Sequence, residues 1–256
     1  MPYADNQNIR IHYQIEGQGP PLVLLHGFYG SMQNFYELGY VAALKDSYQL
    51  ILVDSRGHGI SDKPHDSQDY RMELRVGDIA AVLDAIGIEK AHYMGYSMGG
   101  WIGFGIMKYV PDRFYSLIIG GAQPYERAAV EPHPWLEIFE QGIDAAAEFY
   151  ENMAGPRLSS KRKERMLRND PDAAMAILAN VERVGVVDIL PEVTLPCMLF
   201  AGEDSPEFVN AKKCAQILPN AVFIPLPDLD HVGAFWEIEQ ALPHVKGFLE
   251  AQITFK

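Results

Sequence analysis

The sequence predicts a protein of the α/β class, with a doubly wound, mostly parallel sheet and helices on both faces. Short apolar runs, typical of strands covered on both faces, alternate along the chain with segments of helical spacing. This alternation stops after Gly121, only helical patterns follow to about Leu190, and the alternation then resumes. Because parallel strands need helical crossovers, the simplest topology is one sheet domain interrupted by a helical cap.

The elements before the insertion follow from their apolar patterns. Residues 9–15 alternate apolar and polar side chains and end at Gly17 and Gly19, as a half-buried strand does. The continuous apolar runs that predict buried strands are 22–25, 50–53, 91–94 and 114–119. The segments of helical spacing between them are 35–44, 79–86 and 98–110.

The insertion and the segment after it complete the predicted order. Helical patterns at 145–150 and 173–184 lie within the insertion. The elements predicted after it are strands at 196–201 and 222–224, a helix through Cys214 and a last helix at 238–251. We therefore expect a core formed by residues 1–123 and 191–256, with a helical cap at 124–190.

Composition excludes several classes of protein. A net charge of −13 over 256 residues would repel nucleic acid. No apolar run reaches the roughly 18 residues of a membrane span, and the first residues lack the pattern of a secretory signal. Two isolated cysteines suit a reducing compartment, so we expect a cytoplasmic protein. The histidines and cysteines show no metal-ligand spacing, so no metal is expected.

Ser97 is the predicted nucleophile. It lies at the centre of Gly95-Tyr96-Ser97-Met98-Gly99, which matches Gly-x-Ser-x-Gly between a predicted strand and a predicted helix. Such a turn is so tight that the flanking glycines are needed to avoid clashes. A glycine-rich turn needed only for close helix packing is the alternative.

A serine hydroxyl needs a general base, and His231 is the predicted one. After a nucleophile at such a turn, the acid and then the histidine follow along the chain. Three histidines follow Ser97: His133 lies in the predicted cap, His244 lies in the final helix, and His231 follows the last strand. Only His231 is expected at the carboxyl edge of the sheet.

Asp204 is the predicted acid, since it follows the strand at 196–201. If Ser205 caps the next helix, Asp204 stays in the loop before it. Such an acid fixes the tautomer of the imidazole and stabilises the imidazolium. The alternatives are Glu203, Asp228 and Asp230, and the other structural role for Asp204 is capping that helix.

The backbone N–H groups of Phe28 and Met98 are the predicted oxyanion hole. The segment Leu25-His26-Gly27-Phe28 follows a buried strand, and Met98 follows the nucleophile. His26 precedes the nucleophile and is expected to brace its loop rather than act as a base.

These motifs together resemble the α/β-hydrolase superfamily, and more narrowly its small esterase, lactonase and C–C hydrolase branch. The segments that carry the resemblance are His26-Gly27, Asp54-x-Arg56-Gly57-His58-Gly59-x-Ser61-Asp62, Gly95-Tyr96-Ser97-Met98-Gly99-Gly100, Gly202-Glu203-Asp204 and Asp230-His231. The resemblance spans nearly the whole chain and is weakest from 124 to 190. It implies a mostly parallel eight-stranded sheet and an acyl-enzyme mechanism without a cofactor.

The function expected is hydrolysis of small to medium uncharged carboxylic esters, with lactones as a subclass. Related reactions on the same residues are C–C bond hydrolysis, thioester hydrolysis and perhydrolysis. The alternative outside enzymology is a slow-turnover ligand receptor of the same fold, whose relatives resemble Gly-His-Ser-Val-Ser at the turn. The chain has glycine at position 99 instead, which favours an enzyme.

Aromatic side chains of the cap and of the turn are the predicted substrate contacts. They are Tyr29, Trp101, Tyr125, Trp135 and Phe139. The expected partner is a small-molecule ester or lactone, and the sequence leaves the oligomeric state open. The basic run at 161–165 is expected on a solvated helix face, with a contact to a partner or substrate as the alternative.

Overall fold

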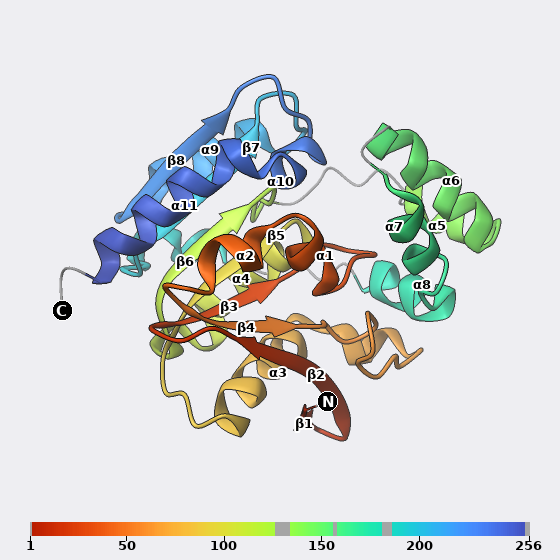
Figure 1. The fold of residues 1–256 in the computed structure, drawn as a ribbon, viewed down its shortest axis with the longest axis horizontal. Coiled ribbons are helices and arrows are strands. Elements are labelled where there is room, and N and C mark those ends of the chain that lie inside the picture. Colours follow the sequence, from red (N-terminus) through yellow and green to blue (C-terminus); the bar gives the residue numbers. More distant parts are fainter. Residues whose placement is uncertain (1, 126–133, 156–157, 181–185, 254–256) are drawn as a thin grey trace.

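A computed structural model describes residues 2–125, 134–155, 158–180 and 186–253. Its centre is one eight-stranded sheet in the order β1-β2-β4-β3-β5-β6-β7-β8 (Figure 1). The strands are β1 (Tyr3–Asn6), β2 (Ile9–Glu16), β3 (Pro21–Leu25), β4 (Gln49–Val53), β5 (Ala91–Tyr96), β6 (Phe114–Gly120), β7 (Cys197–Gly202) and β8 (Ala221–Leu226). β2 is antiparallel to β1 and β4, and β3 to β8 are parallel throughout. The predicted fold class is confirmed.

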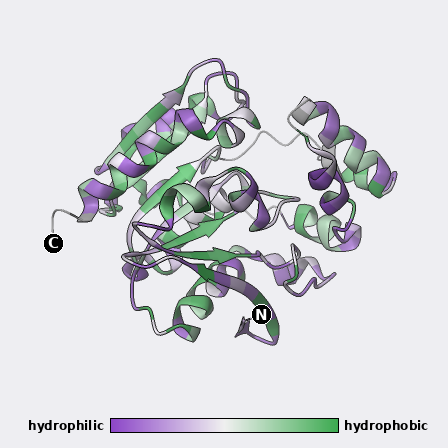
Figure 2. Ribbon diagram, in the orientation of Figure 1, coloured by the Kyte–Doolittle hydropathy of each residue, from purple (hydrophilic) through white to green (hydrophobic). Residues whose placement is uncertain are grey.

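Two helical layers cover the sheet. One face packs against α3 (Met72–Ala85), α4 (Met98–Tyr109) and α9 (Phe208–Ile217). The other packs against α1 (Gln33–Glu37), α2 (Tyr40–Leu44), α10 (Gly233–Trp236) and α11 (Ile238–Ile253). The central strands are apolar on both faces, as a sheet between two helical layers requires (Figure 2). Because β3 to β8 run parallel, their carboxyl ends lie at one edge of the sheet.

Helices fill the segment between β6 and β7. They are α5 (Pro134–Glu140), α6 (Ile143–Ala154), α7 (Ser160–Met166), α8 (Pro171–Ala179) and the 3₁₀ turn η4 (Val187–Glu192). Helices α5 to α8 lie beside the sheet domain (Figure 1), while β6 and β7 pair directly, with Leu117 opposite Cys197. This arrangement supports our proposal that residues 124–190 form an inserted cap on a core of 1–123 and 191–256.

Three of the differences between the observed and the predicted elements are informative. The strand Tyr3–Asn6 at the sheet edge is additional, because only four residues form it. The predicted helix 35–44 is two short helices, because Gly39 adopts a φ of 92° between them. Helix α9 begins at Phe208 rather than directly after Ser205, which decides the position of a catalytic candidate.

Among the described residues, no helix is long and apolar enough to cross a membrane. The 3₁₀ turns η1 (Ser67–Tyr70) and η2 (Pro111–Arg113) complete the core.

Candidate active site

Ser97 lies in a strained turn between β5 and α4. Its φ of 53° and ψ of −111° are costly for a residue with a side chain. The turn brings backbones together so closely that a Cβ at Gly95 would lie 2.3 Å from the carbonyl oxygen of Gly99, and one at Gly99 would lie 2.3 Å from that of Leu25. The glycines of the motif are therefore required by packing. The closely packed backbone holds Ser97 in its strained conformation at the carboxyl end of β5.

His231 approaches the serine from the loop after β8. Its Nε2 lies 3.0 Å from Ser97 Oγ, within hydrogen-bond distance. Tyr96 packs its ring against the imidazole, with centroids 5.4 Å apart, and donates its hydroxyl hydrogen to the His231 carbonyl oxygen. His244 is exposed on α11, and His133 lies outside the described residues. The structure thus brings His231 to Ser97, as the sequence predicts.

The carboxylate at His231 belongs to Glu207, in contrast to the prediction of Asp204. Glu207 Oε2 lies 3.1 Å from His231 Nδ1, and Glu207 is 5% exposed. The hydroxyl of Ser205 donates to the same oxygen at 2.7 Å. Asp204 is exposed, with its backbone N–H bonded to the Leu229 carbonyl oxygen. The arrangement is therefore Ser97, His231 and Glu207.

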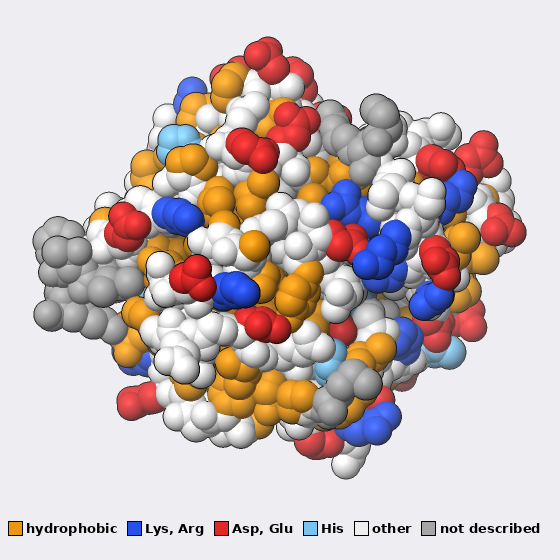
Figure 3. All heavy atoms as spheres, in the orientation of Figure 1, with side chains coloured by type: hydrophobic (Ala, Val, Ile, Leu, Met, Phe, Trp, Pro, Cys, Tyr) orange, Lys and Arg blue, Asp and Glu red, His pale blue; other side chains and the backbone are white. Residues whose placement is uncertain are grey.

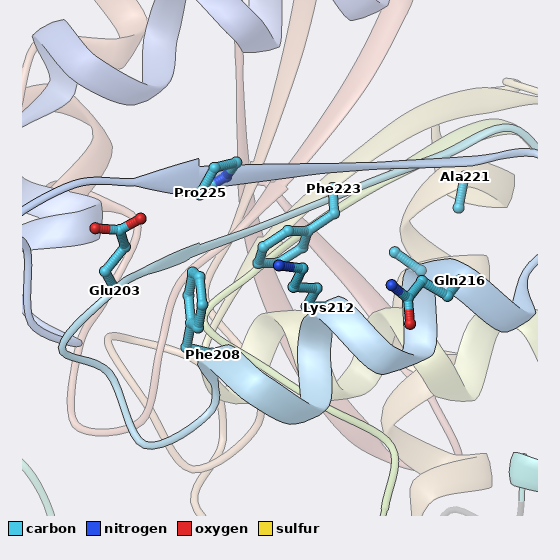
Figure 4. A pocket seen from close by; sticks show the side chains of 8 residues that line it. Glu203, Phe208, Lys212, Gln216, Ala221, Phe223 and Pro225 are labelled. Atoms are coloured by element: carbon cyan, nitrogen blue, oxygen red, sulfur yellow. The ribbon is translucent and has the colours of Figure 1, made fainter.

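The other carboxylates weighed from sequence also lie away from the imidazole. Glu203 lines an open groove of about 480 Å³ between α9 and β8, together with Phe208 and Lys212 (Figure 4). Asp230 accepts a hydrogen bond from the backbone N–H of Gly233 at 2.6 Å, at the start of α10. Asp228 is exposed in a turn with a φ of 57°. None of the three forms an ion pair with His231 within the described part of the chain.

The sequence did not predict Glu207 because α9 begins later than expected. A serine followed by a proline resembles a helix N-cap, which would have placed Glu207 within the first turn and Asp204 before it. The chain instead makes two further turns, and Glu207 becomes the residue before the helix. A signal was present: Glu207 is a third carboxylate in the segment after β7, and its longer side chain can reach back toward the sheet edge.

Two buried histidines brace the loops beside the nucleophile. His26 Nδ1 contacts the carbonyl oxygen of Gly27 at 2.8 Å, and its Nε2 accepts from the backbone N–H of Ser55. His58 Nε2 accepts from the N–H of Tyr29 at 3.1 Å. Burial lowers the pKa of both imidazoles, which keeps them neutral. The structural role expected for His26 is confirmed.

The loop after β3 runs against the nucleophile. A Cβ at Gly27 would lie 3.3 Å from Ser97 Cβ, so the backbone passes directly beside the serine. The Tyr29 N–H already donates to His58, so the neighbouring Phe28 N–H is the candidate oxyanion donor in this loop. Met98 opens α4 immediately after the nucleophile, where N–H groups point away from the helix. Phe28 and Met98 remain our proposed oxyanion donors.

The predicted aromatic contacts divide into two groups. Phe139 of the cap packs edge-on against Tyr29, with centroids 5.2 Å apart, and against Phe28. Trp101, on α4, and Tyr125 are instead partly buried against the core cluster on the face of the sheet that α3, α4 and α9 cover. The side chain of Trp135 lies outside the described part of the structure. Their contact with substrate stays a prediction.

Arginines of the cap reach the core. Arg165 Nη1 and Arg162 Nε lie 2.6 and 3.2 Å from the carboxylate of Glu37 on α1. The Arg162 guanidinium also lies 4.2 Å above the ring of Trp236, five residues beyond His231. Two residues of the basic run are thus partly buried between the inserted helices and the core, which differs from the solvated face predicted. This pairing lowers the pKa of Glu37 despite burial, which acts in the opposite direction.

One group among the described residues has the composition of a metal site. Ligand atoms of His65, Asp170 and Asp172 lie within 4.8 Å of one another at the junction of core and cap. His65 and Asp170 form an ion pair of 3.1 Å, and Asp170 also caps α8 by accepting from the Ala173 N–H. Those two contacts account for the positions of His65 and Asp170, and exposed acidic groups such as Asp172 are common without an ion.

Comparison with known proteins agrees with this fold. The family model for the α/β-hydrolase fold matches residues 20–169. Lipase 1 of Psychrobacter immobilis is 29% identical over 98% of this chain and 82% of its own length. A cis-3-alkyl-4-alkyloxetan-2-one decarboxylase of Shewanella oneidensis is 37% identical, over 49% of this chain and 39% of its own length.

Solved structures show the same fold. An enol-lactonase of Burkholderia xenovorans superposes with a TM-score of 0.86 at 21% identity, covering 97% of this chain and 100% of its own. A thermophilic esterase of Thermogutta terrifontis superposes with a TM-score of 0.82 at 23% identity, covering 95% and 94%. The chain belongs to the α/β-hydrolase fold family, and its relatives support a hydrolase function.

Proposed function

We propose that this protein is a serine hydrolase that cleaves carboxylic esters, lactones included, through an acyl-enzyme. The observation that carries the proposal is the pair of distances at one imidazole: 3.0 Å to Ser97 Oγ and 3.1 Å to Glu207 Oε2. A carboxylate can only accept a hydrogen bond, so His231 carries its proton on Nδ1. Nε2 is then the acceptor that faces the serine hydroxyl.

The first chemical step follows from that tautomer. Ser97 Oγ attacks the substrate carbonyl carbon while its proton passes to His231 Nε2. The buried Glu207 stabilises the imidazolium, and the N–H groups of Phe28 and Met98 hold the oxyanion. The imidazolium returns the proton to the leaving alcohol, which departs and leaves an acyl group on Ser97.

The second step returns the enzyme to its starting state. Water gives a proton to His231 Nε2 and attacks the acyl carbon. Collapse of the second tetrahedral intermediate, with the proton passing back to Ser97 Oγ, releases the acid. A lactone would leave its alcohol and acid in one product, with no change in the roles of the three residues.

Covalent labelling and turnover test the proposal together. A fluorophosphonate should label wild-type protein at Ser97 in a one-to-one ratio, and Ser97→Ala should stay folded, unlabelled and inactive. A panel of esters, lactones, thioesters and vinylogous diketones then ranks the bond cleaved. Steady turnover of esters or lactones supports the proposal. A single burst equal to the enzyme concentration would indicate a receptor, and preference for diketones would indicate a C–C hydrolase.

A further inference from the structure

Arg75 is a buried cation beside the nucleophile turn. It lies on the first turn of α3 and is 2% exposed. Its Nη2 donates to the thioether sulfur of Met98 at 3.1 Å, and Met98 directly follows the nucleophile. The guanidinium carbon lies 5.8 Å from the ring centre of Trp101 and 5.9 Å from that of Tyr70. Arg75 is thus surrounded by a sulfur atom and two aromatic faces.

Among the described residues, no carboxylate forms an ion pair with Arg75, although the charge of Asp78 acts on it at longer range. The nearby Asp78 is bonded through both oxygens to Arg56, with a distance of 2.6 Å from Arg56 Nε, and also to Asn6. Arg75 forms no ion pair with any described residue, and its Nε is buried without a hydrogen-bond partner. Arg56, Arg75 and Asp78 together therefore leave one buried positive charge. Burial lowers the pKa of Arg75 only to about 10, so the group is charged at neutral pH.

Burying such a charge costs free energy, and the contacts around Arg75 offset only part of that cost. A buried ion normally has a counter-ion, and aromatic faces offer a weaker interaction than a carboxylate. An apolar side chain of similar length would fill the same volume without that penalty. The stability of the fold therefore does not explain a charge at this position, whereas an anion that forms nearby during the reaction does.

We propose that Arg75 is a positioning residue that stabilises the oxyanion of the tetrahedral intermediate through Met98. The inference rests on the proposed function. When Ser97 attacks, the carbonyl π electrons move to the oxygen, which becomes negative beside the Met98 N–H. A fixed, buried cation in contact with the Met98 side chain and not paired with any described carboxylate favours that charge. Its contact with the thioether also holds the first turn of α4 in place.

Three variants test this role. Arg75→Met removes the charge with little change in volume, Arg75→Lys keeps it, and Arg71→Met removes an exposed charge from the start of the same helix. With a neutral p-nitrophenyl ester, Arg75→Met should lower kcat about tenfold and change KM by less than about twofold. Arg75→Lys should recover most of kcat, and Arg71→Met should match the wild type.

A transition-state analogue and thermal unfolding separate this role from a structural one. An alkylboronic acid, whose adduct on Ser97 is an anionic tetrahedron, should bind Arg75→Met about tenfold more weakly. The melting temperature of Arg75→Met should be equal to or higher than that of the wild type, since a desolvated charge has been removed. Slower turnover with unchanged or greater stability is the expected signature.

Other results would overturn the inference. A less stable Arg75→Met whose activity Arg75→Lys does not restore would assign Arg75 to packing. An effect only on KM, and only for esters that carry a carboxylate, would make Arg75 a substrate anchor. If Arg75→Met does not fold, Arg75→Gln is measured in the same way, and full kcat in that variant contradicts the proposal. Absence of Ser97 labelling in the wild type would refute the proposed function itself.

Discussion

At the scale of single residues, the buried carboxylate of Glu207 is held by two hydrogen bonds, from Ser205 Oγ and from His231 Nδ1. Both bonds go to the same oxygen, Oε2. A glutamine could accept them only through its carbonyl oxygen, without the negative charge that stabilises the imidazolium, and its nitrogen would donate instead. In Glu207→Gln, the amide can leave His231 in the tautomer that places its proton on Nε2, facing Ser97. We expect kcat to fall by about 10³–10⁴, measured by steady-state ester hydrolysis.

Asp204→Asn is the matched control for that experiment. Asp204 is exposed and contributes only its backbone N–H to the turn, so the variant should keep kcat within about twofold of the wild type. A large loss in Asp204→Asn combined with full activity in Glu207→Gln would show that the carboxylate seen beside His231 is not the catalytic one.

His26 and His58 predict how stability depends on pH. Both folded-state pKa values lie below the unfolded value of about 6.5, because burial disfavours the charged imidazole. The unfolded chain therefore binds more protons below pH 6.5, so stability is full above that pH and falls as the pH decreases. Each histidine contributes up to about 1.4 kcal/mol per pH unit.

Urea unfolding measures this dependence directly. The free energy of unfolding should fall between pH 6.5 and 5.5, by at most about 2 kcal/mol for the two imidazoles together. In His58→Gln the slope should be about half as steep. Equal stability at both pH values would mean that the two histidines are protonated in the native state.

Local motifs explain which site residues could be predicted. Ser97 was identifiable because its turn demands glycines at fixed offsets, and His231 because only one histidine follows the last strand. Glu207 was not, because its place depends on where α9 begins. Ser205 does not cap that helix; its hydroxyl donates to Glu207, and the helix begins three residues later, at Phe208. Arg75 was equally hidden, since a lone arginine at helical spacing ordinarily lies on a solvated face.

At the scale of elements, the contact between α7 and α1 ties the cap to the core. Glu37 accepts from Arg162 and Arg165, and all three side chains are less than a quarter exposed. Basic and acidic side chains lie together on the side of the molecule that α6 and α7 occupy (Figure 3). Hydrogen bonds to charged groups at such depth contribute about 1.5–3 kcal/mol each.

Glu37→Gln should loosen the cap without unfolding the sheet. Losing the charge of the carboxylate leaves two partly buried guanidiniums uncompensated, so amides of α7 should exchange with deuterium about tenfold faster. Amides of β5 should be unchanged. Glu151→Gln is the control, because its ion pair with Lys163 lies within the cap and both side chains are more than 40% exposed. Equal acceleration in both variants would show that the cap does not depend on Glu37.

The elements themselves follow closely from periodicity, with informative exceptions. Seven of the strands coincide with apolar or alternating runs, since burial on one or both faces imposes that pattern. The edge strand Tyr3–Asn6 was not predicted because it has only four residues, half of them exposed. The break at Gly39 was not predicted because the apolar spacing continues across it.

At the scale of the whole molecule, the proposed cap packs apolar side chains against the loop after β3, which runs beside the serine turn. Ile177 of α8 packs with Tyr70 and Phe28, and Phe139 of α5 packs with Tyr29. An apolar, covered site should favour uncharged esters of short to medium acyl chains. Across p-nitrophenyl esters from acetate to palmitate, kcat/KM should therefore peak at or below about eight carbons.

The chain-length series has a clear contrary result. A maximum at palmitate, or a jump in activity above the critical micelle concentration of the substrate, would mean that the cap opens onto a lipid surface. Ser97→Ala provides the background rate for each ester, so that surface-catalysed hydrolysis is not counted as turnover.

The direct pairing of β6 with β7 has a consequence for how this protein could acquire new specificities. The two strands are hydrogen-bonded neighbours, with Ile119 opposite Leu199, although about 75 residues of sequence separate them. The sheet therefore closes without help from the insertion, and the entropy of closing that loop grows only slowly with its length. Cap segments of different length and composition can be exchanged at this junction while Ser97, Glu207 and His231 keep their places. Under the proposed function, the substrate contacts of the insertion and the bond-cleaving residues of the core lie in parts of the chain that can evolve, or be engineered, separately.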